Sequence, residues 1–159
     1  MPLVYSPPVD LSTLAPHELA DDLRTALNSA LPLLRAISEQ EAGNPVSGEK
    51  WSRKQVLGHL IDSAANNLQR FVRLQIENEL RFPSYQQEGW VAVQNYHART
   101  WNDLIVLWEA LNLHLAHIMQ NTAREHLGRP WIREDENLSL GFIMQDYTGH
   151  LRHHLKQIL

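Results

Sequence analysis

The chain has 159 residues, of which 43% are hydrophobic and 20% are charged, and these values are typical of one soluble globular domain spanning residues 1–159. It contains no cysteine, which excludes disulfide bonds, thiolate metal ligands and a cysteine nucleophile. The net charge of −4, with basic residues scattered along the chain, argues against nucleic-acid binding. No apolar run reaches the roughly 18 residues that a membrane-spanning helix needs, and the N-terminus MPLVYSPPVD lacks the features of a signal peptide, so we expect a cytoplasmic protein.

The first predicted helix covers about residues 17–40. Its leucines recur every three or four residues, which is the spacing of one helix face; they are Leu19, Leu23, Leu27, Leu31 and Leu34. Pro32 interrupts this pattern. Because a proline inside a helix removes a backbone hydrogen bond and clashes with the preceding turn, we expect a kink or a break there.

The second and third predicted helices cover about residues 52–80 and 100–121. Ser52, followed three residues later by Gln55, forms a capping-box pattern, and Thr100 with Asp103 forms a weaker one. A longer crossover of mixed polar and aromatic residues, PSYQQEGWVAVQNYHA, connects the two helices.

The last predicted helix covers about residues 139–157, with Ser139 as its N-cap. No segment alternates convincingly between apolar and polar residues, as a half-buried strand would. We therefore expect an all-α protein, a four-helix bundle with a longer crossover between helices two and three.

Three histidines lie near the end of the last helix. Each helical residue advances by about 100°, so His150 and His154, four residues apart, lie on the same face at the edge of the apolar stripe. His153 points away from that stripe. Two imidazoles at this spacing can share one metal ion, although histidines in such positions are more often ordinary boundary residues of an amphipathic helix.

A third ligand could come from His59 in the second helix. His59 lies on a polar line of that helix together with Ser63, Asn66 and Arg70. This line is either a solvated face or the polar wall of a groove in which an ion and a substrate could lie.

The sequence resembles the DinB/YfiT-like superfamily of bacterial four-helix bundles. The segment KWSRKQVLGHLIDS resembles the family's Trp-Ser and His-Leu entry to the second helix, and HLRHHLKQI resembles its closing His-x-x-His-His pattern. Members of that family bind a divalent metal through one histidine of the second helix and two of the fourth. The resemblance therefore implies His59, His150 and His154 as metal ligands and leaves His153 unused, in agreement with the helical wheel.

Three neutral imidazoles leave an ion its full +2 charge and open coordination positions, which suits catalysis. Zinc and nickel accept such ligands better than magnesium or calcium do. Asp62 and Asp146 lie close in sequence to the proposed ligands. Either could orient a histidine or act as a general base, or both could be exposed surface acids.

Three functions are compatible with these features. The resemblance implies an enzyme that acts on a small molecule, with a low-molecular-weight thiol as cofactor in an S-transfer reaction. The alternatives are a metal-dependent hydrolase that activates water, and a non-catalytic, metal-binding dimeric module. In each case the family resemblance and the large apolar residues predict a homodimer; the sequence identifies no catalytic residue beyond the metal ligands.

Overall fold

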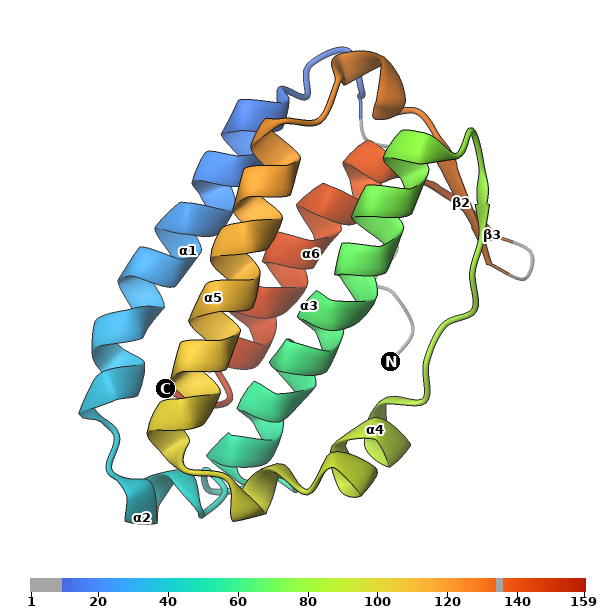
Figure 1. Cartoon of the computed structure of the whole chain (residues 1–159). Helices are drawn as coiled ribbons and strands as arrows, with labels where there is room; N and C mark the ends of the chain where they lie inside the picture. Colours follow the sequence, from blue (N-terminus) through green and yellow to red (C-terminus); the bar gives the residue numbers. More distant parts are fainter. Residues whose placement is uncertain (1–9, 134–135) are drawn as a thin grey trace.

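Four long helices form the bundle in the computed structural model, which describes residues 10–133 and 136–159 (Figure 1). The long helices are α1 (Pro16–Ala36), α3 (Arg53–Ile76), α5 (Trp101–Gln120) and α6 (Leu140–Leu155). Helices α1 and α3 each pack against both α5 and α6. The predicted four-helix bundle is confirmed, and no helix in the described ranges is long and apolar enough to cross a membrane.

The first helix differs from its predicted bounds. It continues through Pro32 without a break, and it ends at Ala36, where Ile37 takes an extended conformation. Pro32 and Asn28, whose carbonyl loses its usual partner, both lie on the exposed face, so water can satisfy that carbonyl. Of the kink or break expected at Pro32, the break does not occur. The residues that follow form a separate short helix, α2 (Glu39–Ala42), which begins at a capping box of Ser38 and Glu41.

The crossover is required by the directions of the helices. Helices α3 and α5 run the same way, so the chain must return along the bundle between them (Figure 1). It does so through strand β1 (Leu80–Arg81), helix α4 (Gln87–Gln94) and the 3-10 turn η1 (Tyr96–Ala98). The second predicted helix therefore ends at Ile76, earlier than the expected 80, because residues beyond it already belong to the crossover.

A small sheet at one end of the bundle was not predicted. After α5, the 3-10 turn η2 (Arg124–His126) leads to the hairpin of β2 (Pro130–Arg133) and β3 (Glu136–Ser139). Strand β1 pairs in parallel with β2, and β2 pairs antiparallel with β3. These strands have two to four residues each, which is too short for a pattern of alternating polarity to be recognised.

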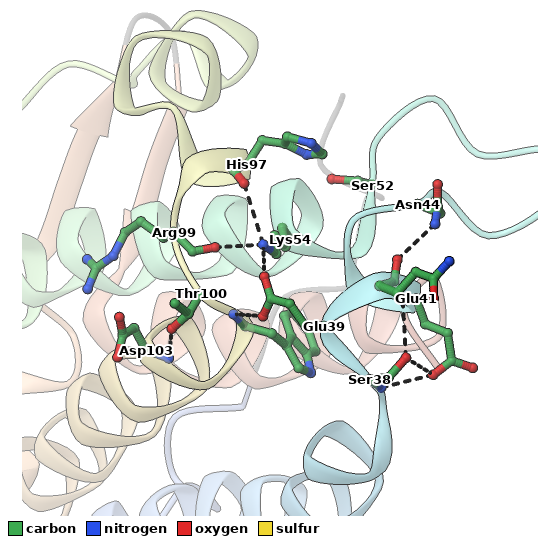
Figure 2. A network of polar contacts seen from close by, with 12 residues as sticks. Ser38, Glu39, Glu41, Asn44, Ser52, Lys54, His97, Arg99, Thr100 and Asp103 are labelled. Carbon is green, nitrogen blue, oxygen red and sulfur yellow. Dashed lines mark hydrogen bonds and ion pairs between the residues drawn. The ribbon is translucent and has the colours of Figure 1, made fainter.

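The buried Lys54 links the N-terminal end of α3 to the neighbouring segments (Figure 2). The Lys54 ammonium group is paired with the Glu39 carboxylate of α2, and it donates to the Arg99 carbonyl at 2.7 Å. The other Glu39 oxygen accepts from the backbone N–H of Trp101 at 2.7 Å, at the start of α5. This network joins α2, α3, the end of the crossover and α5 at the end of the bundle where His59 lies.

Candidate metal centre

Three histidines from two neighbouring helices lie together inside the bundle. The candidate ligand nitrogens of His59 on α3 and of His150 and His154 on α6 all lie within 4.8 Å of one another. The ring centroids are 4.6 Å apart for His59 and His154, and 4.5 Å apart for His150 and His154. The side chain of His153 is exposed, as the helical wheel predicted. The structure thus brings together the same three histidines that the sequence selected.

The three imidazoles are uncharged at neutral pH. Burial, reinforced by the neighbouring histidines His154 and His150, lowers the pKa of His59 to about 3. Burial and the proximity of His154 lower the pKa of His150 to about 4, and burial also lowers the pKa of His154. Each ring therefore keeps a nitrogen lone pair available, which is the form that a metal ion binds.

His59 has an environment that suits a metal ligand. Its side chain is 0% exposed, and neither Nδ1 nor Nε2 has a hydrogen-bond partner among the described residues. Burying an imidazole with both nitrogens unsatisfied costs free energy that a fold ordinarily avoids. A divalent ion among the three rings would satisfy one of these nitrogens, so the donor set fits an ion of this kind.

Gln157 orients one of the ligands, and sequence reasoning missed it. Its Oε1 lies 2.6 Å from Nδ1 of His154. An amide oxygen in this position accepts a hydrogen bond from Nδ1–H, which leaves Nε2 of His154 as the free ligand nitrogen. The signal was present in the sequence, because Gln157 follows His154 by three residues, the spacing of neighbours on one helix face.

The two aspartates considered from the sequence lie in different environments, and neither orients a histidine among the described residues. Asp62 is buried, and its Oδ1 accepts hydrogen bonds from Tyr96 Oη at 2.5 Å and from Gln94 Nε2 at 2.6 Å. Its partners therefore come from the crossover, and neither it nor the half-buried Asp146 makes a hydrogen bond to a histidine among the described residues. Burial raises the pKa of both carboxyl groups. The interpretation of Asp62 as an exposed surface acid is wrong.

The polar line of α3 lies inside the protein. His59, Ser63, Asn66 and Arg70 are all 7% exposed or less, so the interpretation as a solvated face is wrong. A cavity of about 720 Å³ lies beside the cluster, and its lining includes His154, Gln157 and Trp51. The Trp51 ring lies 5.5 Å from the His59 ring, between centroids. A small molecule in this cavity would reach the histidine cluster.

The described hydrogen bonds also explain why the site forms at this point of α3. Ser52 is the N-cap of this helix. Its side chain accepts a hydrogen bond from the Gln55 backbone N–H, and the Gln55 side chain accepts one from the Ser52 backbone N–H, so the predicted capping box is confirmed. Ser139 caps α6 in the same position relative to its helix by accepting from the Phe142 N–H. These caps fix where α3 and α6 begin, and so set which faces His59 and His150 present.

Comparison with known proteins agrees with this picture. A family model described as the DinB superfamily matches residues 22–158. A protein of Oceanobacillus iheyensis named "Putative metal-dependent hydrolase OB0413" is 21% identical over 143 residues, which cover 89% of this chain and 82% of that protein. Among solved structures, YfiT from Bacillus subtilis, described as "a probable metal-dependent hydrolase with an unusual four-helix bundle topology", superposes with a TM-score of 0.85 at 18% identity, over 97% of this chain and 89% of that chain. The chain belongs to the DinB superfamily.

Proposed function

We propose that this protein is a metal-dependent hydrolase that acts on a small molecule, with His59, His150 and His154 as the ligands of one divalent ion. The observation that carries the proposal is the set of three neutral imidazoles, two buried and one half-buried, whose nitrogens lie within 4.8 Å of one another. The descriptions of the Oceanobacillus iheyensis and Bacillus subtilis proteins as metal-dependent hydrolases support the choice of reaction.

An ion held by three imidazoles supplies Lewis acidity at its open positions, where it can polarise a substrate carbonyl or activate water. The residues of this chain would hold the ion and orient its histidine ligands. Gln157 fixes the ring of His154 in one tautomer, and the packed bundle excludes bulk water from His59, which is fully buried. Nitrogen ligands favour zinc or nickel over magnesium or calcium, and we propose one of these two ions.

The test of the proposal has two stages. Elemental analysis of the purified protein should find close to one zinc or nickel ion per chain, and the His59→Ala variant should lose it. The metal-loaded protein is then assayed with a panel of carboxylic esters, amides and phosphate esters, beside the metal-free protein and the His153→Ala variant. Hydrolysis that needs the metal and survives His153→Ala supports the proposal. Metal binding without hydrolysis of any of these compounds would favour a non-catalytic metal-binding module.

The thiol-dependent reaction is tested in the same preparation. A low-molecular-weight thiol that binds through the ion shifts the absorption spectrum of the nickel or cobalt-substituted protein, because thiolate coordination adds charge-transfer bands. Such a shift, with S-transfer activity and without hydrolysis, would replace the hydrolase proposal. The absence of cysteine in the chain means that any spectral thiolate signal comes from the added thiol.

A further inference from the structure

A second buried cation, Arg70, lies on α3 two turns and more beyond the histidine cluster. The Arg70 side chain is 7% exposed, and its guanidinium group stacks on the Trp131 ring with the central carbon 3.9 Å from the ring centroid. Its one side-chain hydrogen bond in the described ranges runs from Nη1 to Asn67 Oδ1 at 3.2 Å, and Nε has no partner there. A guanidinium group has five N–H donors, so most of this group's hydrogen-bonding capacity is unused.

The charges around Arg70 do not compensate it. The groups that act most on the guanidinium are the Tyr85 phenol and the Arg133 guanidinium, and Arg133 lies over the same Trp131 ring at 5.4 Å. Arg133 has its own carboxylate partner, Glu136, whereas no carboxylate of the described residues lies within 4.0 Å of Arg70. Burial lowers the pKa of Arg70 to about 10, which still leaves the group charged at neutral pH. A buried charge without a counter-ion costs several kcal/mol in general, and such groups are usually paired.

The position of this cation relates it to the histidine cluster. The bond to Asn67 places the guanidinium beside residue 67, eight residues from His59 on the same helix, which is about 12 Å along the helix axis. The cavity beside the histidines extends in this direction, because Tyr85 and Arg133 line it together with His154. The buried hydroxyl of Ser63 and amide of Asn66 lie between the two ends on α3.

We propose that Arg70 binds an acidic group of the substrate, a carboxylate or a phosphate, while the reacting bond lies at the histidine cluster about 12 Å away. This inference rests on the proposed function, because it takes the cavity that His154, Tyr85 and Arg133 line as the substrate site. The planar guanidinium fork matches two oxygens of either anion, and stacking on Trp131 holds the fork in one orientation. The anion would supply the missing counter-charge. The substrate class is therefore an elongated small molecule with one anionic end.

The choice of variants uses a matched arginine on the same helix. Arg73 also lies over an aromatic ring, that of Phe82, with its central carbon 5.3 Å from the centroid, but it is only half-buried and is paired with Glu77 at 2.9 Å. Arg70→Met removes the charge and keeps an unbranched side chain, and Arg70→Lys keeps the charge without the fork. Arg73→Met is the control.

Binding of inorganic phosphate and of succinate is measured by isothermal titration calorimetry, with each variant both metal-free and metal-loaded. We expect wild-type protein to bind at least one of these anions without metal, and Arg70→Met to weaken that binding by about 10 to 100-fold. Arg70→Lys should fall between them, and Arg73→Met should bind as wild type does. The preference between phosphate and succinate distinguishes the two kinds of acidic group.

Two further readouts separate a binding role from a structural one. In anion-free buffer the unfolding temperature of Arg70→Met should equal or exceed that of wild type, because the variant removes an uncompensated buried charge. Its metal content should be unchanged. A clear fall in unfolding temperature, or phosphate and succinate binding equal to wild type, would overturn the proposal, as would a wild-type protein that binds neither anion. Since anion binding is measured without metal, failure of the metal site alone leaves this result readable.

Discussion

Two adjacent histidines of α6 should differ sharply in their effect on metal binding. The nitrogens of His154 lie within the cluster with those of His59 and His150, whereas His153 is exposed and lies outside the cluster. The His154→Ala variant removes one of three protein ligands. The His153→Ala variant removes a solvated side chain and should leave metal affinity unchanged.

The magnitude follows from the number of ligands lost. Structural zinc sites with four ligands bind with about 10–16 kcal/mol, or about 3 kcal/mol for each ligand, so the loss of His154 should weaken binding by about 100-fold or more. Gln157→Ala leaves the three ligands in place and removes only the group that orients His154. Its loss should weaken binding by about 10 to 100-fold. The expected order of affinity is thus wild type and His153→Ala, then Gln157→Ala, then His154→Ala.

Metal affinity is measured by competition with a chromophoric chelator, together with metal per chain after dialysis. Circular dichroism of each metal-free variant checks that the bundle remains folded, and His154→Gln replaces His154→Ala if the smaller side chain impairs folding. Loss of metal by His153→Ala with retention by His154→Ala would refute both the ligand assignment and the orientation of α6. Equal affinity of Gln157→Ala and wild type would refute the role of Gln157 alone.

Three other predictions concern stability and assembly. Because the pKa of His59 is lowered to about 3, the unfolded chain binds a proton at this residue below about pH 6.5 that the folded chain does not. His59 alone should therefore cost the metal-free protein up to about 1.4 kcal/mol of stability per pH unit as the pH falls from 6.5 towards 3, in addition to the loss from His150. A His59→Leu variant with the same pH dependence as wild type in denaturant titrations would contradict this. A Cβ at Gly58 would lie 2.1 Å from the Tyr96 ring, so Gly58→Ala should lower the free energy of unfolding by about 1–3 kcal/mol. Gly149 lies inside α6 with open space around it, so Gly149→Ala should raise the free energy of unfolding by about 0.5–1 kcal/mol. The reverse signs in urea titrations would show that the crossover does not pack on α3 as described. Light scattering should report twice the monomer mass of 18.3 kDa, and the monomer mass at micromolar concentration would refute the homodimer.

The sequence predicted the four long helices because each has a strong apolar period and three of them have a polar N-cap. The caps at Ser52, Thr100 and Ser139 are all present, and the helices begin within one residue of them. The ends were predicted less well. The first and second helices each continue several residues too far in the prediction, since apolar residues such as Ile37 and Leu80 pack on the core from extended segments and preserve the appearance of a helical period.

The ligand set could be predicted, but the environment of the ligands could not. The spacing of His150 and His154 follows directly from the helical period, and the family motif added His59. Burial of the polar line on α3 depends instead on segments distant in sequence, namely the crossover and the β2–β3 hairpin, which contribute Tyr96 and Trp131. A polar helix face has the same sequence pattern whether water or another segment covers it, so the pattern leaves both interpretations open.

The unpaired polar atoms of the bundle are concentrated on α3. The helix buries 15 of its 24 residues, compared with 8 of 20 for α5, so its polar side chains must find partners inside the protein. Most of them do: Lys54 binds Glu39, Asn66 donates to the Asp62 carbonyl, and Asn67 donates to the Ser63 carbonyl. Of the six buried side-chain atoms without a partner in the described ranges, four belong to α3, and three of these are nitrogens of His59 and Arg70. A fold that satisfies most of the other polar groups of the same helix has no structural need for these two. Their unused nitrogens are explained if His59 helps to bind a cation and Arg70 binds an anion. A metal-dependent enzyme for an acidic substrate requires this arrangement.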